Sequence, residues 1–196
     1  MDDAAQLLEP EVLHTAAEVL ARPSVIPPAP GVYAWYFAEL PPRVFTDGCH
    51  RYRSMPLLYV GIAPKAPPRD GRPGSRQTVR KRLQYHFRGN AAGSTLRLTL
   101  GCLLAEELGI GLRRVGSGNR FTFSDGEKLL SGWMAENARV AYTVTERPWE
   151  LEERLIKELA LPLNLDQNKH SPFHQTLSDL RATQRASARA LPVVAN

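Results

Sequence analysis

Two short runs of β-branched and aromatic residues constrain the fold of this chain more than any other feature. They cover Gly31 to Phe37 and Leu57 to Ile62, and Pro and Gly residues bound them. Runs of this length and composition are typical of buried strands. Only residues 38–56 separate the two runs, so we expect the strands to pair antiparallel in one sheet.

A third strand and several helices complete the predicted fold. Residues 139–145 alternate well enough for a third main strand, and residues 120–124 predict a short strand or hairpin arm. Apolar residues recur at helical spacing in five segments, 4–21, 77–88, 95–108, 128–137 and 149–161, and the C-terminal tail is loosely helical. We therefore predict an α/β protein of the α+β kind, with a small, mainly antiparallel three-stranded sheet flanked by helices.

The length and composition of the chain favour one soluble domain. Its 196 residues, 43% of them hydrophobic, can bury a sizeable core. No run of about 18 apolar residues is present, and the acidic N-terminus is unlike a secretory signal. We expect a cytoplasmic protein without a membrane partner, nucleoid-associated if it is bacterial. Cys49 and Cys102 lie far apart, so neither a disulfide framework nor a zinc site is indicated.

Positive charge is concentrated in one segment of the chain. Between Pro64 and Asn90, eight basic residues stand against the single acid Asp70, so this segment carries +7 while the whole chain carries +5. The segment favours a polyanionic partner, and a solvated charged face is the alternative. The candidate nucleic-acid-binding residues are Lys65, Arg69, Arg72, Arg76, Arg80, Lys81 and Arg88, together with Arg97 from the following helix.

One carboxylate in the helix predicted at residues 149–161 points towards the core. At about 100° per residue, Glu152 falls near the middle of the apolar stripe of this helix, whereas Glu150 and Glu153 fall outside it. A carboxylate turned inwards is costly unless a cation or hydrogen bonds receive it. An arginine of the same chain is one candidate partner. A divalent metal ion is the other, since Mg²⁺ is often held by one or two carboxylates, water and substrate phosphate.

Two further polar residues share one edge of an apolar helical stripe. In the helix predicted at residues 77–88, Arg82 and His86 are four positions apart, so they lie on the same side of the helix. A histidine at such an edge is more often a structural residue than a catalytic one. Arg82 by itself is typical of a surface residue.

Each of the two central strands combines a tyrosine with a glycine. Gly31 precedes Tyr33 by two positions, and Gly61 follows Tyr59 by two. Glycine weakens a strand unless a bend or a close approach requires it. Each tripeptide alone is ordinary strand sequence, and only their order along the chain makes them informative.

The ordered set of motifs resembles the GIY-YIG nuclease family. That family has a G-[IV]-Y strand, a Y-[IV]-G strand, a helix bearing Arg, a helix bearing Glu and a later Asn. Every element has a counterpart here, and the family pattern selects the same glutamate as the helical periodicity. The matching positions are Gly31, Tyr33, Tyr59, Gly61, Arg82, Glu152 and Asn164, with His86 four residues after the Arg.

The resemblance covers about residues 30–168 and suggests three parts of the chain. We expect an N-terminal helical arm at 1–29, a nuclease domain at 30–168 and a basic tail at 169–196. Long insertions, such as the one at about 91–137, and a His after the Arg also occur in restriction-endonuclease-like members, so the resemblance favours that branch over the minimal domain. The insertion also contains Arg113, Arg114 and Arg120. The sequence is compatible both with contact of these residues with substrate and with a position on a solvated surface.

The resemblance implies a metal-dependent endonuclease that cleaves DNA. Glu152 would hold one Mg²⁺ or Mn²⁺, and Arg82 would pair with a phosphate oxygen. Tyr33 would act as, or relay to, the general base, which requires nearby positive charge because free Tyr titrates at about 10. Tyr59 and His86 would position the water and the phosphate. Asn164 would orient Tyr33 or water on the metal.

Several alternatives stay open at the level of sequence. One is a structure-selective repair or recombination nuclease, and another is a non-catalytic nucleic-acid-binding module that retains the fold. RNA is an alternative substrate, because nothing in the sequence reads or rejects a 2′-hydroxyl. A homodimer is also open, since the N-terminal helix could dock on a partner as well as on its own core.

Overall fold

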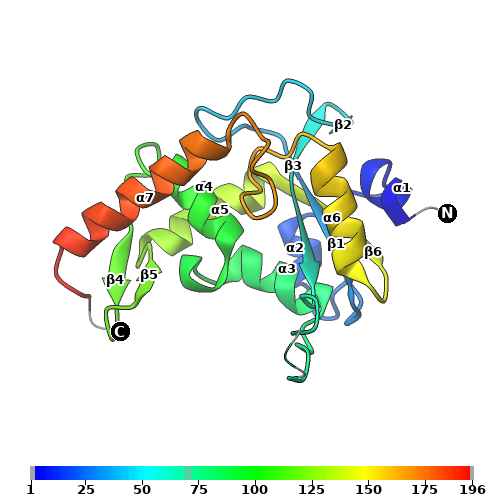
Figure 1. The fold of residues 1–196 in the computed structure, drawn as a ribbon, viewed down its shortest axis with the longest axis horizontal. Helices are drawn as coiled ribbons and strands as arrows, with labels where there is room; N and C mark the ends of the chain where they lie inside the picture. Colours follow the sequence, from blue (N-terminus) through cyan, green and yellow to red (C-terminus); the bar gives the residue numbers. More distant parts are fainter. Residues whose placement is uncertain (1–2, 69, 71, 195–196) are drawn as a thin grey trace.

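The computed structural model describes residues 3–68, 70 and 72–194, and a four-stranded sheet lies at its centre (Figure 1). The strand order is β2 (Arg51–Tyr52), β3 (Met55–Ala63), β1 (Gly31–Phe37) and β6 (Ala138–Val144), and all neighbours are antiparallel. The α+β class and the three main strands confirm the prediction. The number of strands was wrong, because the two-residue β2 is too short to show a periodic pattern.

Strand β1 is buried along its whole length and contributes to two cores. Alternate side chains of a strand point to opposite faces. The residues on one face, Tyr33, Trp35 and Phe37, belong to the larger core. Those on the other face, Val32, Ala34 and Tyr36, belong to the smaller core. Since β3 and β6 cover both edges of β1, this strand is enclosed on every side.

A β-bulge adjusts the register between β1 and β3. Trp35 pairs with Tyr59, whereas Tyr36 pairs with Leu57, so Leu58 is the extra residue on β3. Leu58 and Tyr59 both pack in the larger core, which also contains Tyr33. The two motif tyrosines therefore share one face of the sheet.

Helices cover both faces of the sheet. On the smaller core lie α1 (Asp3–Leu8) and α6 (Pro148–Glu158), which contact β6 and the β1–β3 pair respectively. On the larger core lie α2 (Ala16–Leu20), α3 (Val79–Arg88) and α5 (Gly126–Asn137). The predicted helices 77–88, 128–137 and 149–161 are all confirmed, with shifted ends.

The N-terminal segment differs from the single helix predicted at residues 4–21. Two short helices, α1 and α2, take its place. Pro10 has no N–H to donate to a continuing helix. After it, the backbone of His14 exchanges two hydrogen bonds with Val140 on the outer edge of β6, at 2.8 and 2.9 Å. The segment thus covers an edge that a continuous helix would have left open.

The insertion and the C-terminal segment form a second body of structure beside the sheet. The insertion contains η1 (Ala91–Gly93), α4 (Thr95–Leu103) and the hairpin of β4 (Arg113–Val115) and β5 (Arg120–Thr122). Helix α4 ends earlier than the predicted residue 108. The long α7 (His174–Ala190) packs on α4 and β4.

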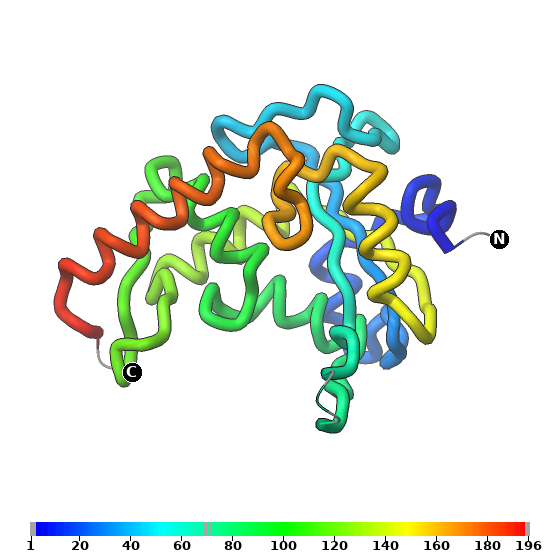
Figure 2. Tube along the Cα trace, in the orientation of Figure 1, coloured from blue at the N-terminus to red at the C-terminus, as the bar shows by residue number. Residues whose placement is uncertain are grey.

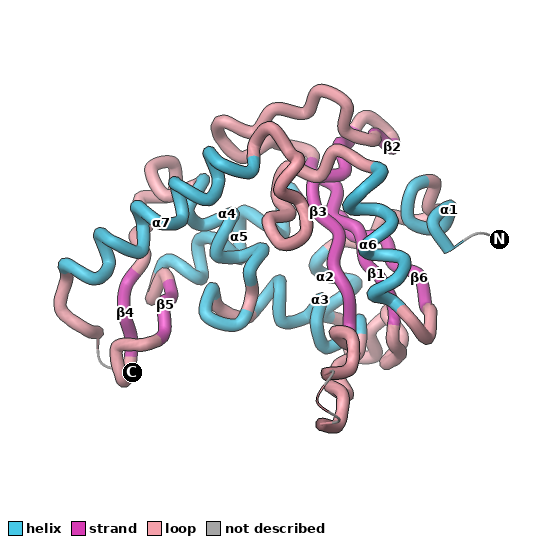
Figure 3. The backbone as a smooth tube through the Cα atoms, in the orientation of Figure 1, coloured by secondary structure: helices cyan, strands magenta, loops and turns pink. Residues whose placement is uncertain are grey.

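The β4–β5 hairpin lies towards one end of the molecule, away from the four-stranded sheet (Figure 3), and α1 and α7 lie at opposite ends of its long axis (Figure 2). The described residues 64–68, 70 and 72–78 project from the body next to α3 (Figure 2). Among the described residues, no helix combines the length and the apolar character needed to cross a membrane.

Candidate active site

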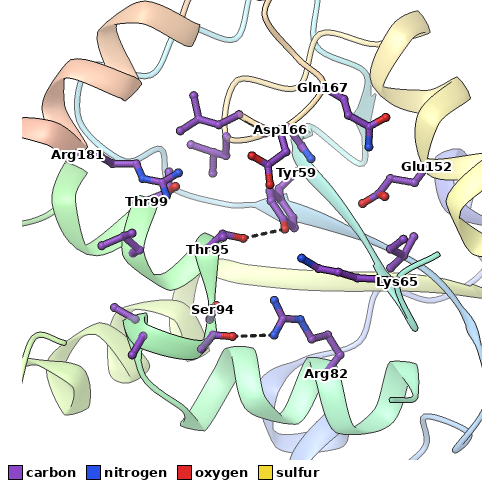
Figure 4. Close-up of a pocket in the computed structure, with 18 of the residues that line it drawn as sticks. Tyr59, Lys65, Arg82, Ser94, Thr95, Thr99, Glu152, Asp166, Gln167 and Arg181 are labelled. Carbon is purple, nitrogen blue, oxygen red and sulfur yellow. Dashed lines mark hydrogen bonds between the residues drawn. The ribbon is translucent and has the colours of Figure 1, made fainter. Parts of the chain in front are cut away.

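A cleft of about 840 Å³ contains five of the six predicted catalytic residues and one of the eight predicted nucleic-acid-binding residues. One set of lining residues comes from the sheet and the helices α3 and α6. The other set comes from η1, α4, β5, α7 and the loop after α6. Figure 4 shows how side chains from these elements converge. The predicted site residues that line the cleft are Tyr33, Tyr59, Lys65, Arg82, Glu152 and Asn164.

The cleft opens at the outer edge of β3. Within the described chain, β2 pairs with this edge only as far as Pro56, and the loop after α6 then takes its place. Leu163 N donates to Leu58 O at 3.0 Å, which satisfies part of the exposed edge. Because no strand extends further, side chains from both faces of the sheet reach the same cleft.

Asn164 completes the edge of β3 with its side chain. Its Oδ1 accepts from Val60 N at 3.0 Å, and its Nδ2 donates to Val60 O at 2.9 Å. The amide therefore holds the backbone between Tyr59 and Gly61. Because the strand backbone occupies both ends of the amide, Asn164 acts on the site through β3, and its predicted role in orienting Tyr33 or water on the metal stays a prediction.

The two motif glycines permit close packing of backbone and ring. Gly61 pairs with Tyr33 across the sheet, and a Cβ at Gly61 would lie 2.6 Å from the Tyr33 hydroxyl. A Cβ at Gly31 would lie 2.1 Å from the carbonyl oxygen of Thr143 on β6. Only glycine lets the Tyr33 ring lie against β3 and lets β1 enter the sheet at this point.

Tyr33, His86 and Ser94 form a buried hydrogen-bonded chain. The Tyr33 hydroxyl lies 2.9 Å from His86 Nε2, and His86 Nδ1 lies 2.7 Å from Ser94 Oγ. Burial, together with Arg82 and Arg97, lowers the pKa of His86 well below its usual value. His86 is consequently neutral at neutral pH. A neutral His86 adds no positive charge beside Tyr33.

The two tyrosines sit in an environment that favours the neutral phenol. Burial raises the pKa of Tyr33, and Tyr59 adds to this effect, while Arg82 opposes it. Burial likewise raises the pKa of Tyr59, whose hydroxyl lies 3.5 Å from Thr95 Oγ1. Arg82 is the nearest cation that acts on both phenols.

Arg82 is held in place by a backbone carbonyl and keeps donors free. Its Nη1 donates to Gly93 O at 2.7 Å, which fixes the guanidinium beside η1 (Figure 4). A guanidinium has five N–H donors in a planar fork. Several donors therefore remain for an anion in the cleft.

Glu152 points into the cleft from α6, as the periodicity predicts. Burial raises the pKa of its carboxyl to about 7, with Lys65 lowering it and Asp166 raising it further. Within the part of the chain that the structure describes, Glu152 forms no ion pair and no hydrogen bond, in contrast to Glu153, which pairs with Lys157 at 2.7 Å. The intramolecular arginine partner considered from sequence is thus not found.

Comparison with known families supports this reading of the motifs. A model described as the GIY-YIG catalytic domain matches residues 31–183, which is most of the chain. The chain belongs to the GIY-YIG family. No curated protein and no solved structure matches it. Membership of this nuclease family implies a nucleic-acid substrate.

GIY-YIG nucleases generally use a divalent metal ion, and the cleft offers one strong oxygen ligand for it. Among the described residues, no group of three or more His, Cys, Asp or Glu side chains gathers as a metal cage. Glu152 is nevertheless a half-buried carboxylate without a cation partner, and this arrangement suits a hard divalent ion that completes its shell with water and phosphate. The residues present fit such a site.

The basic segment that the sequence singled out is only partly at the cleft. Lys65 lines it. Arg80 donates instead to Ile26 O, and Arg72 pairs with Asp70 at 2.7 Å. Arg69 lies outside the described residues. The remaining members, Arg76, Lys81 and Arg88, are exposed.

Arg97 is the clearest error among the predicted nucleic-acid-binding residues. Its side chain is fully buried and pairs with Glu127 at 2.6 Å. It also donates to the carbonyls of His86 and Phe87 at the end of α3, at 2.9 and 3.2 Å. Arg97 joins α3 to α5 rather than facing a ligand, because its donors satisfy helix-end carbonyls and a buried carboxylate.

The sequence missed several polar residues of the cleft. Ser94 and Thr95 begin α4, and Ser94 is the N-cap of that helix. This N-cap pattern could have been found, but not its contact with His86. The others lie on the loop after α6, on the insertion and on α7, and they are Asp166, Gln167, Asn119, Arg181 and Arg185. Arg120, for which the sequence left substrate contact open, also lines the cleft.

Proposed function

We propose that this protein is a metal-dependent endonuclease that hydrolyses phosphodiester bonds in DNA. The observation that carries the proposal is the unpaired Glu152 carboxylate in the same cleft as Arg82 and the two tyrosines. Phosphodiester hydrolysis needs an activated water, neutralised phosphate charge and a stabilised leaving oxygen. These groups supply all three.

Glu152 would hold a single Mg²⁺ or Mn²⁺ in this proposal. The bound ion would neutralise phosphate charge and stabilise the leaving 3′ oxygen. With its pKa raised to about 7, the carboxyl binds a cation better as the pH rises through that value. A pair formed by one carboxylate and one metal ion fits the few acids at this site.

Arg82 would bind the scissile phosphate through its free donors. Its contact with Gly93 O orients the guanidinium before substrate arrives. A preorganised Arg fork binds two phosphate oxygens at once. The same positive charge favours the phenolate form of Tyr33 as the reaction proceeds.

Tyr33 would receive a proton from the attacking water and pass its own proton to His86. Nε2 of neutral His86 can accept that proton, provided that Nδ1–H donates to Ser94 Oγ. His86 touches neither the cleft nor the phosphate in this scheme and acts through Tyr33. Asn164 positions β3, and thereby Tyr59, through the Val60 backbone.

Cleavage assays test the proposal directly. Purified protein is incubated with plasmid and with single-stranded DNA, with and without Mg²⁺, beside Glu152→Ala and the matched control Glu153→Ala. Glu153 is the neighbouring glutamate and pairs with Lys157 on the surface. We expect metal-dependent cleavage by the wild type and by Glu153→Ala, and none by Glu152→Ala. Equal cleavage by both variants, or no cleavage at all, contradicts the proposal, and the latter result favours a binding module.

We place the protein in the restriction-endonuclease-like branch on the basis of two features. His86 follows Arg82 on α3 and contacts Tyr33, and the insertion supplies part of the cleft. Digestion of unmodified genomic DNA should give discrete fragments. Cleavage confined to forks, flaps or bubbles would instead identify a structure-selective nuclease, and preferential cleavage of RNA would change the substrate class.

A further inference from the structure

Two arginines of α7 line the cleft on the side away from the motif residues. Arg181 and Arg185 are four positions apart, so they lie one turn apart on the same face of the helix. Figure 4 shows Arg181 entering beside Thr99, across the cleft from Glu152. Neither residue belongs to the motif set.

Both guanidinium groups lack a partner that would explain their position. Within residues 3–68, 70 and 72–194, neither forms an ion pair, and Arg181 Nε is buried without a hydrogen-bond acceptor. Burial lowers the pKa of Arg181, and Arg185 lowers it further, while Asp166 in the same cleft partly opposes this. Two cations held close together at a partly buried place are costly unless an anion binds there.

Other arginines near α7 show what a structural role looks like. The Nε atoms of Arg113 and Arg114 are also buried without an acceptor, but their Nη2 atoms donate to the carbonyls of Pro192 and Leu191, at 3.2 and 2.9 Å. Arg189 lies over the ring of Phe121, 5.6 Å from its centroid. Arg181 and Arg185 differ from all three, because they turn to the cleft instead of to protein groups.

We infer that Arg181 and Arg185 bind a second phosphate of the nucleic-acid strand whose scissile phosphate lies between Arg82 and Glu152. This inference rests on the proposed function. An Arg fork matches the tetrahedral oxygens of a phosphate, and two forks one helical turn apart can hold one phosphate from two sides. Helix α7 then belongs to the substrate site.

DNA binding at different salt concentrations tests this inference. The paired variant Arg181→Ala/Arg185→Ala is compared with Arg189→Ala, which removes a positive charge from the same helix outside the cleft. All are made in a Glu152→Gln background so that bound DNA stays intact. We expect the paired variant to bind roughly tenfold or more weakly. The slope of log K against log salt should fall by about 0.9 for each lost phosphate contact on duplex DNA, or about 0.7 on single strands.

Steady-state cleavage with an intact Glu152 gives a second readout. The paired variant should raise the KM for DNA by roughly tenfold or more while kcat changes by less than about threefold. A structural role would instead lower the Tm and change both constants. If the Tm falls, Arg181→Gln/Arg185→Gln replaces the alanine pair, because glutamine keeps most of the side-chain bulk.

The outcomes separate this inference from the proposed function. Unchanged affinity and unchanged salt slope in the paired variant overturn the α7 site. The same loss in Arg189→Ala also overturns it, since the effect would then be one of general charge. If the wild type cleaves no DNA, the proposed function fails, yet the binding comparison still decides whether α7 contacts a phosphate.

Discussion

The motif wall of the cleft and the layer behind the opposite wall use arginine and acid in opposite ways. On the motif wall, Glu152 forms no ion pair with any described residue, and Arg82 keeps free donors. Behind the opposite wall, Arg97 and Glu127 satisfy each other and the surrounding backbone. A buried charge that is paired is satisfied within the fold and is costly to leave alone, whereas a charge left unpaired at a cleft is available to a ligand. Chemistry is therefore expected on the first wall and stability behind the second.

The largest effect should come from Tyr33→Phe, which removes one hydroxyl from the motif wall. Loss of the contact with His86 Nε2 should lower kcat by about 10²- to 10⁴-fold, the usual range for a group that transfers protons. The ring remains, so the Tm should stay close to that of the wild type. Tyr142→Phe is the matched control, since Tyr142 pairs with Tyr33 across the sheet but lies outside the cleft. A lower Tm for Tyr33→Phe together with an unchanged kcat would contradict the comparison.

The next effect concerns stability and comes from Arg97→Met. Glu127 would be left without its buried partner, and the carbonyls at the end of α3 would lose a donor. We expect a loss of about 3–5 kcal/mol in the free energy of unfolding, measured by urea denaturation. The exposed Arg88→Met should change it by less than about 0.5 kcal/mol. If Arg97→Met instead lost much of its DNA affinity at unchanged stability, Arg97 would be a substrate contact after all.

Asn164→Ala should have an intermediate effect on both properties. The N–H and C=O of Val60 would lose their partner at the edge of β3, at a cost of about 1–3 kcal/mol. Cleavage should fall less than in Tyr33→Phe, because Asn164 acts on the site through the strand backbone. His170→Ala, an exposed residue of the same loop that does not line the cleft, is the control for thermal denaturation and for kcat. Unchanged stability in Asn164→Ala would show that water replaces the amide.

The smallest effect is a gain of stability in Glu152→Gln without metal. A carboxyl whose folded pKa is raised to about 7 stabilises the fold fully below its unfolded pKa, and this contribution is lost as the pH rises through 7. At pH 8 the variant should therefore melt a few degrees above the wild type, since about 1 kcal/mol moves the Tm of such a chain by roughly 2–4 °C. At pH 4, below the unfolded pKa of the carboxyl, the two should coincide. A higher Tm for the wild type at pH 8 would mean that Glu152 has a cationic partner.

The sequence predicts the individual elements better than the contacts between them. Helical periodicity places Glu152 inward, and strand composition predicts β1 with its observed bounds. The contact between Tyr33 and His86 joins positions 53 residues apart and depends on how α3 lies on the sheet. A local sequence pattern does not show how a helix packs on a sheet, so it cannot predict this contact.

Arg82 and Arg97 show where sequence reasoning fails. Both are arginines on helices near the basic segment, and only the structure distinguishes the cleft residue from the buried one. One signal was present, because α4 is apolar on nearly every side and every one of its residues from Leu96 to Leu103 is buried. A helix that is apolar all round is enclosed, so an arginine within it needs an internal partner. The local sequence pattern does not predict that this partner is Glu127.

The double burial of β1 has a consequence for the motions of the site. Since β1 belongs to both cores and to two strand pairings, neither face of the sheet can open alone without breaking contacts of this strand. Its amide hydrogens should exchange with solvent only when the whole sheet unfolds, as in the slowest cooperative unit of a protein. Tyr33 therefore lies on the element that opens least often. The motions that admit substrate and release product are expected in the loops and helices around β1.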